Sequence, residues 1–226
     1  MSIATAMAYK TLIKNTAKNS LVLLTALIAL LLQNPVSASE PAKILVLGDS
    51  LSAGYRMDIS DSWTTLLQNK LMELDYGYSV VNASISGDTT SSGLQRLPRA
   101  LKVHQPDIVI IELGGNDGLR AYPLPTVRAN LLRMIQLSQE ANARVILAGI
   151  QIPPNYGKGY ADEFTALFFD VAAETDVAII PFFMENVALN PAMMQGDNIH
   201  PTVGAQPLLL QNTWVVLEPL LNAGSD

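Results

Sequence analysis

The chain has 226 residues, 49% of them hydrophobic, with 14 basic and 20 acidic side chains and a net charge of −6. An acidic surface repels phosphate backbones, and no run of basic residues offsets it, so we expect no nucleic-acid partner. The absence of cysteine excludes disulfides, thiol nucleophiles and thiolate metal sites together.

Residues 1–38 have the layout of a secretory signal peptide. Three lysines precede an apolar run at 21–32, and Val36 and Ala38 supply the small residues of a cleavage site. The run is short for a membrane span. An uncleaved N-terminal anchor is the rival interpretation, which the polar segment 39–41 disfavours because it is not a stop-transfer pattern.

Cleavage leaves residues 39–226, enough for one domain with a substantial core. The removed segment carries three lysines and no acidic residue, so the net charge falls to −9. We therefore expect a periplasmic or secreted protein with no stable membrane anchor after cleavage.

Short β-branched runs alternate with longer amphipathic stretches throughout the mature chain. This alternation is typical of βαβ units and predicts a flavodoxin-like three-layer α/β/α fold around a five-stranded parallel sheet. The strands are expected at 43–47, 79–83, 107–113, 144–149 and 177–181, and the helices at 63–74, 93–103, 126–140, 160–174 and 203–221.

Ser50 is the candidate nucleophile. It follows the first expected strand directly, in the segment Gly48-Asp49-Ser50, and so stands at the carboxyl end of the sheet, where ligands bind in doubly wound folds. The α/β-hydrolase elbow requires glycine two residues after its serine, whereas Ser52 occupies that position here. By itself, Gly-Asp-Ser is equally typical of a polar turn that caps a helix.

The chain has two histidines, of which His200 is the candidate base. His104 precedes the third strand, at the opposite end of the sheet, and is interpreted as a helix C-terminal residue. Asp197, three residues before His200, can orient the imidazole as the acid of a triad. The pair could instead form a surface turn and a cap, or provide two metal ligands, but no further histidine or cysteine is available to complete a zinc site. We predict no metal and no cofactor.

Three donors could stabilise an oxyanion at this edge of the sheet. They are the backbone N–H groups of Ser50 and Gly87 and the side-chain amide of Asn116. Each of the loop sequences that contain Gly87 and Asn116 is also an ordinary turn sequence. Their joint occurrence on carboxyl-end loops, in this order, favours a catalytic site.

Four sequence blocks resemble those of the SGNH (GDSL) hydrolases: Gly48-Asp49-Ser50-Leu51-Ser52, Gly87, Gly114-Gly115-Asn116-Asp117 and Asp197-x-x-His200. The resemblance extends over essentially the whole mature chain. It implies a serine hydrolase of thioesters, aryl esters and lysophospholipids, with Ser50 as nucleophile, Gly87 and Asn116 as oxyanion donors, Asp197 as acid and His200 as base. Gln151, Ile152 and Met193 depart from the residues expected in the family, which affects substrate preference and not mechanism.

The loops after the fourth and fifth strands are apolar, which suggests a site for acyl chains. The residues predicted to contact substrate are Ile152, Pro153, Tyr156, Phe183 and Met193. These side chains could alternatively fill the core beneath the loops. Two other functions are compatible with the fold, namely an esterase for acetylated carbohydrate, which predicts a polar cleft, and a binding domain without catalysis.

Overall fold

The computed structural model describes residues 7, 10 and 41–222. The chain divides into two units, Met1–Glu40 and Pro41–Asp226, and the second unit contains the sheet and the helices that cover it. The predicted signal peptide and its cleavage site lie outside the described residues, apart from Met7 and Lys10. No helix among the described residues is long and apolar enough to span a bilayer.

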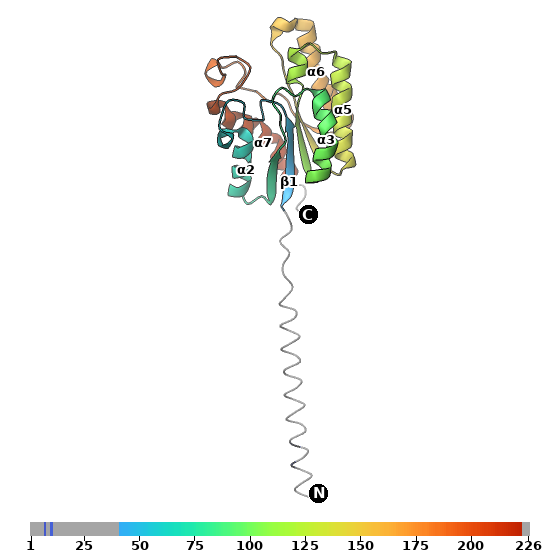
Figure 1. Cartoon of the computed structure of the whole chain (residues 1–226), viewed down its shortest axis with the longest axis vertical. Coiled ribbons are helices and arrows are strands. Elements are labelled where there is room, and N and C mark those ends of the chain that lie inside the picture. Colours follow the sequence, from blue (N-terminus) through green and yellow to red (C-terminus); the bar gives the residue numbers. More distant parts are fainter. Residues whose placement is uncertain (1–6, 8–9, 11–40, 223–226) are drawn as a thin grey trace. The chain divides into compact units, whose positions relative to one another are not determined.

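Five parallel strands form one sheet between layers of helices (Figure 1). Their order, β2-β1-β3-β4-β5, confirms the predicted flavodoxin-like arrangement. The strand order reverses at β1, because β2 pairs with one of its edges and β3 with the other. The strands are β1 (Ala42–Gly48), β2 (Tyr78–Asn82), β3 (Ile108–Glu112), β4 (Arg144–Ala148) and β5 (Ala178–Ile180).

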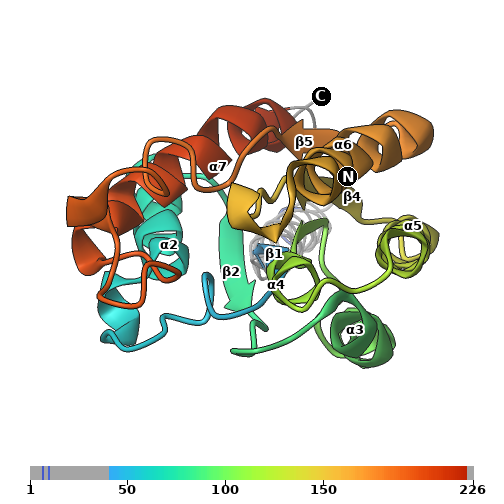
Figure 2. The same ribbon diagram turned by 90° about the horizontal axis from the view of Figure 1, so that it is seen from above.

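Helices cover both faces of the sheet (Figure 2). Helices α2 and α7 lie together on one face, and α3, α5 and α6 cover the other, with α3 beside α5 and α5 beside α6. Short 3-10 helices occur in the loops. The helices are α2 (Trp63–Glu73), α3 (Thr90–His104), α4 (Gly115–Leu119), α5 (Leu124–Glu140), α6 (Lys158–Thr175) and α7 (Gln206–Asn222), and the 3-10 helices are η1 (Ile59–Asp61), η2 (Pro154–Tyr156), η3 (Pro191–Met193) and η4 (Val203–Ala205).

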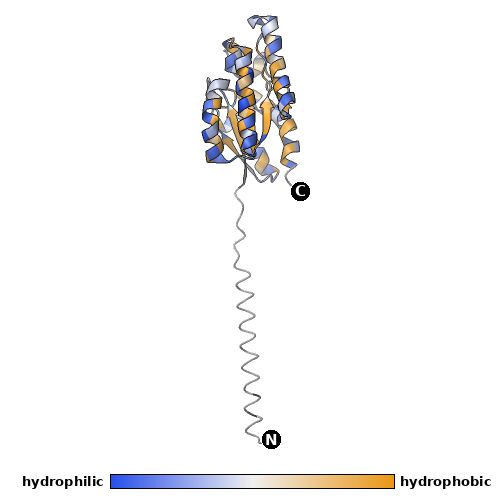
Figure 3. Ribbon diagram, turned by 90° about the vertical axis from the view of Figure 1, so that its right-hand side faces the viewer, coloured by the Kyte–Doolittle hydropathy of each residue, from blue (hydrophilic) through white to orange (hydrophobic). Residues whose placement is uncertain are grey.

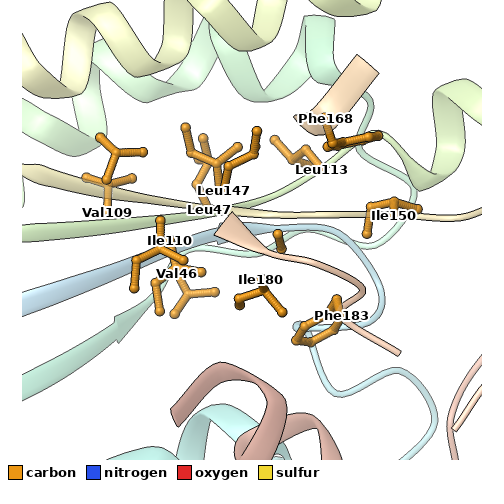
Figure 4. Close-up of a cluster of buried hydrophobic side chains, with 14 of the residues drawn as sticks. Val46, Leu47, Val109, Ile110, Leu113, Leu147, Ile150, Phe168, Ile180 and Phe183 are labelled. Atoms are coloured by element: carbon orange, nitrogen blue, oxygen red, sulfur yellow. The ribbon is translucent and has the colours of Figure 1, made fainter. Parts of the chain in front are cut away.

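The core lies on both sides of the sheet, as expected for parallel strands covered by helices. Val46 and Ile110 point to one side, and Leu47 and Val109 to the other (Figure 4), and all four are completely buried. Burying each such side chain stabilises the fold by about 1.5–3 kcal/mol. The strands are correspondingly hydrophobic in Figure 3, whereas the outer surfaces of the helices are mainly hydrophilic.

The segment after β3 departs from the prediction. A loop was expected there, but Gly115–Leu119 forms the short helix α4. Glycine, asparagine and aspartate are poor helix formers, so local propensity opposes this helix and tertiary contacts must stabilise it. Buried Asp117 supplies them, because its carboxylate accepts hydrogen bonds from the Thr90 backbone N–H at 2.8 Å and the Thr90 hydroxyl at 2.7 Å.

Helix α3 begins three residues before its predicted start. Thr89 forms a capping box with Ser92, in which each side chain accepts a hydrogen bond from the backbone N–H of the other residue. This cap adds one turn to the helix at the carboxyl end of the sheet. The loop between β2 and α3, which contains Gly87, is shortened accordingly. Helix α3 ends at His104, as expected from its position before the third strand.

Candidate active site

Ser50, His200 and Asp197 form a continuous hydrogen-bonded series. The Ser50 Oγ lies 2.9 Å from His200 Nε2, and His200 Nδ1 lies 2.8 Å from Asp197 Oδ2. A carboxylate can only accept, so Nδ1 donates to Asp197, and in the neutral ring Nε2 is then the acceptor for the Ser50 hydroxyl. This is the tautomer in which an imidazole can remove a proton from serine.

A tight turn between β5 and α7 positions His200. Met194 and Pro201 form an antiparallel bridge, and the Gln195 N–H donates to the His200 carbonyl at 2.7 Å. At the turn, Asp197 Oδ1 accepts from the backbone N–H groups of Ile199 and His200, each at 3.0 Å. These bonds hold the pKa of Asp197 well below its usual range, the largest cause being the N–H of His200. Asp197 is therefore ionised at neutral pH.

The three predicted oxyanion donors lie on the loops that leave β1, β2 and β3. Among the described residues, neither the Ser50 N–H nor the Gly87 N–H has a hydrogen-bond acceptor. Gly87 has φ +86°, which favours glycine, and no atom lies within 4 Å of the position that a Cβ would occupy. The Asn116 Nδ2 donates to Asp49 Oδ2 at 3.0 Å, so one of its two N–H groups is used and the other is available.

Sequence reasoning missed the roles of two buried carboxyl groups, Asp49 and Glu112, near Ser50 at the carboxyl ends of β1 and β3. Asp49 and Glu112 are 2% and 0% exposed, and β1 and β3 are aligned so that Gly48 pairs with Glu112. The Glu112 Oε2 accepts from the Ser52 hydroxyl at 2.6 Å and from the Asp49 N–H at 3.4 Å. Asp49 Oδ1 accepts from the Leu51 N–H at 3.0 Å. The sequence does contain a signal for Glu112, since an acidic residue at the end of an otherwise apolar strand is unusual.

Burial determines the charge of this pair. Desolvation raises the pKa of Asp49 to about 6, opposed by its bonds from Leu51 and Asn116. Desolvation, followed by repulsion from Asp49, raises the pKa of Glu112 well above its ordinary value of 4.5. Asp49 accepts two hydrogen bonds that favour its anion, whereas Glu112 Oε1 has no partner among the described residues. We therefore assign the anion at neutral pH to Asp49 and the proton to Glu112.

This assignment predicts how stability depends on pH. A carboxyl group whose pKa is raised by folding stabilises the folded state at low pH, and that contribution is lost as pH rises above the unfolded-state value of 4.5. Glu112→Gln removes the titrating carboxyl group and retains a side-chain oxygen that can accept the hydrogen bond from the Ser52 hydroxyl. In urea unfolding at pH 5 and pH 8, we expect the wild type to lose more stability between the two pH values than this variant does. Equal losses would show that Glu112 is ionised in the folded protein.

Arg96 on α3 joins the loops around the site. Its Nε donates to Asp88 Oδ2 at 2.6 Å, and its Nη2 donates to the Gly48 carbonyl at 3.1 Å. Its Nη1 donates to the carbonyl of Ala83. The guanidinium therefore ties the end of β1 to the loop that carries Gly87. A single arginine in an amphipathic helix gave no sequence signal for this role.

The five residues predicted to contact substrate occupy different environments. Pro153 is exposed, Tyr156 is 37% exposed and Met193 is half-buried, so all three are accessible on the loops after β4 and β5. Ile152 is 8% exposed and packs against Gly118 of α4. Phe183 belongs to the buried cluster in Figure 4 and is completely buried. Its ring lies 5.5 Å from that of Trp63. The prediction for Phe183 is therefore corrected, because a side chain held in the core by aromatic packing does not line an open site.

Within residues 41–222, no group of three His, Asp or Glu side chains is arranged to hold a metal ion. The His200 ring forms its hydrogen bonds to Asp197 and to Ser50. The site as a whole consists of a hydrogen-bonded hydroxyl, an oriented imidazole, a carboxylate and N–H donors without acceptors. These are the groups that acyl transfer through serine requires.

Comparison with known proteins identifies close relatives. Residues 46–206 match the GDSL-like lipase/acylhydrolase family. Esterase TesA of Pseudomonas aeruginosa is 47% identical over 88% of this chain and 98% of its own, and thioesterase 1/protease 1/lysophospholipase L1 of Escherichia coli K12 is 47% identical over 83% and 89%. The crystal structure of TesA has 49% identity and a TM-score of 0.77, and covers 79% of this chain and 99% of its own.

A second solved structure is that of the psychrotrophic esterase EstA from Pseudoalteromonas sp., inhibited by monoethylphosphonate. It has 40% identity and a TM-score of 0.77, and covers 80% of this chain and 98% of its own. These relatives agree with the family resemblance drawn from the four sequence blocks.

Proposed function

The chain belongs to the GDSL-like lipase/acylhydrolase family and is an ester hydrolase, and we propose that it cleaves acyl esters and thioesters through Ser50, His200 and Asp197 with an acyl-enzyme intermediate. The observation that carries the proposal is the pair of hydrogen bonds from Ser50 to His200 and from His200 to Asp197. No cofactor takes part in this mechanism.

In the acylation step, Ser50 Oγ attacks the carbonyl carbon while its proton passes to His200 Nε2. Ionised Asp197 stabilises the imidazolium that forms. The carbonyl oxygen becomes an oxyanion, which the N–H groups of Ser50 and Gly87 and the Asn116 amide stabilise. The imidazolium then protonates the leaving alcohol or thiol. A water molecule then attacks the acyl-enzyme, with His200 again taking the proton, and the carboxylic acid is released.

The proposed substrates are small molecules with an apolar acyl chain, namely aryl esters, acyl thioesters and lysophospholipids. The accessible loop residues Pro153, Tyr156 and Met193 support this proposal, because planar and flexible apolar side chains suit acyl chains of varied length. The names of the relatives also support it, since they include an arylesterase from Vibrio mimicus and a thioesterase/lysophospholipase.

A turnover panel tests the substrate class. Aryl esters, lysophospholipids and acyl-CoA thioesters of graded chain length would be compared with acetylated carbohydrate. We expect activity on the first three classes and a preference that varies with chain length. Turnover of acetylated carbohydrate alone would contradict the acyl-chain proposal. Failure of a fluorophosphonate probe to label the protein would contradict the proposed acyl-enzyme mechanism through Ser50.

We also propose that the protein is exported, with cleavage after Ala38. Intact-mass measurement of the exported protein is expected to give a chain that begins at Ser39, because Val36 and Ala38 fit the small-residue recognition site behind a short apolar run. A protein that begins at Met1 and sediments with membranes would support the uncleaved anchor instead.

A further inference from the structure

Tyr55 lies against the face of the His200 imidazole. The centroids of the two rings are 4.0 Å apart, and their planes are inclined by 31°. Hydrogen bonds to Ser50 and Asp197 fix the directions of the two ring nitrogens within the plane of the imidazole. These two bonds resist tilting of the imidazole out of its plane least. The Tyr55 ring, which lies against the face of the imidazole, limits that tilting.

The backbone of Tyr55 is attached to the same turn that carries the base. The Gln195 Nε2 donates to the Tyr55 carbonyl at 3.1 Å and to the Pro201 carbonyl at 2.9 Å. One amide therefore connects the loop after the nucleophile to the residue that follows His200. This connection ties the backbone of Tyr55 to the turn that carries His200.

The contact is made by the ring of Tyr55 and not by its hydroxyl. Within residues 41–222, the Tyr55 hydroxyl forms no hydrogen bond. The chain turns at Arg56 through left-handed backbone (φ 54°), and the Arg56 guanidinium lies 5.1 Å from the centroid of the Tyr55 ring. This cation–π contact adds a second constraint on the position of the ring.

We propose that Tyr55 is a positioning residue that holds the imidazole of His200 during deacylation. The inference rests on the proposed function. When Ser50 Oγ carries an acyl group, it has no proton to donate, so the hydrogen bond to Nε2 is absent. Asp197 and the ring of Tyr55 are then the contacts that keep the imidazole facing the ester.

Deacylation requires this orientation for a complete proton transfer. The oxygen of a water molecule bonds to the acyl carbon while one of its protons moves to His200 Nε2. The bond between Ser50 Oγ and the acyl carbon then breaks, and the proton passes from Nε2 to Oγ. The products are the carboxylic acid and free Ser50. An imidazole that tilts away from the ester slows the first of these transfers, because general-base catalysis depends on hydrogen-bond geometry.

Two substitutions separate the ring from the hydroxyl. Tyr55→Phe retains the aromatic face, whereas Tyr55→Leu removes it and retains most of the apolar volume. Tyr76→Leu is the matched control, because Tyr76 packs on another aromatic residue, Trp214, with centroids 5.8 Å apart, and precedes β2 at the opposite end of the sheet. The measurements are pre-steady-state and steady-state hydrolysis of a chromogenic aryl ester, together with the melting temperature.

For Tyr55→Leu we expect kcat to fall about tenfold and the burst to approach about one product per enzyme, because the acyl-enzyme accumulates. Tyr55→Phe should retain kcat within about twofold, since it preserves the ring contact. Tyr76→Leu should lower the melting temperature and leave kcat unchanged.

Three outcomes would overturn the inference: wild-type kcat in Tyr55→Leu, a fall in kcat without a larger burst, or an equal fall in Tyr55→Phe. Failure of the proposed function has a different signature. In that case the wild type forms no acyl-enzyme, or hydrolysis of the ester persists in the Ser50→Ala variant. Neither result depends on the residue at position 55.

Discussion

Replacing Ser50 by alanine is expected to lower kcat for ester hydrolysis by about 10⁶, the loss typical of removing a triad nucleophile. Ser50 Oγ is the hydroxyl within hydrogen-bond distance of His200 Nε2, at 2.9 Å, and without it no acyl-enzyme can form. Binding and the oxyanion donors remain, so a small residual rate over water is expected. The measurement is kcat on an aryl ester, with fluorophosphonate labelling located by peptide mass.

Ser91→Ala is the matched control, because Ser91 is an exposed residue of α3 whose hydroxyl forms no hydrogen bond within residues 41–222. Its kcat and labelling should equal those of the wild type. Both variants should melt at temperatures close to that of the wild type, since Ser50 is only half-buried. Full hydrolytic activity in Ser50→Ala, or phosphonate attached to a different residue, would remove Ser50 from the mechanism.

The fold was predictable from the sequence because its main determinants are local. Apolar β-branched runs such as those before Ser50 and Asn116 indicate buried parallel strands, and their alternation with amphipathic helices leaves few topologies. The observed boundaries of the strands differ from the predicted ones by one residue at most ends, as expected where fraying and hydrogen-bond pairing decide the last residue. Helix α4 was not predictable, because the contact that stabilises it, between Asp117 and Thr90, joins residues 27 positions apart.

The polar groups that support the site were less accessible to sequence reasoning. Glu112 acquires its role from the pairing of β1 with β3, which places it under the loop that begins at Asp49. The proposed positioning role of Tyr55 depends on contact with His200, which lies 145 positions later in the sequence and packs against the Tyr55 ring. Phe183 shows the opposite error, since an apolar residue on a loop at the catalytic end proved to be part of the core. In each case the deciding contact is tertiary.

Asn116→Ala is expected to lower kcat by about 10² to 10³ with little change in KM, as for other single oxyanion donors. Asn116 belongs to α4, and its Nδ2 is held by Asp49 Oδ2 at 3.0 Å, an arrangement that fixes the amide before substrate binds. A donor fixed in this way stabilises the charged tetrahedral intermediate more than the neutral carbonyl, so its loss affects kcat and not substrate binding.

The competing role for Asn116 is to brace α4 through the bond to Asp49. Asn130→Ala is the control for that role, because the Asn130 Nδ2 donates to Thr90 Oγ1 at 3.0 Å and so belongs to the network that secures α4 through Asp117. Asn130→Ala should lower the melting temperature and largely preserve kcat. If Asn116→Ala behaves in the same way, with a lower melting temperature, a higher KM and a nearly normal kcat, its amide braces the helix and is not an oxyanion donor. A large loss of kcat in Asn116→Ala at an unchanged melting temperature would assign the amide to the oxyanion.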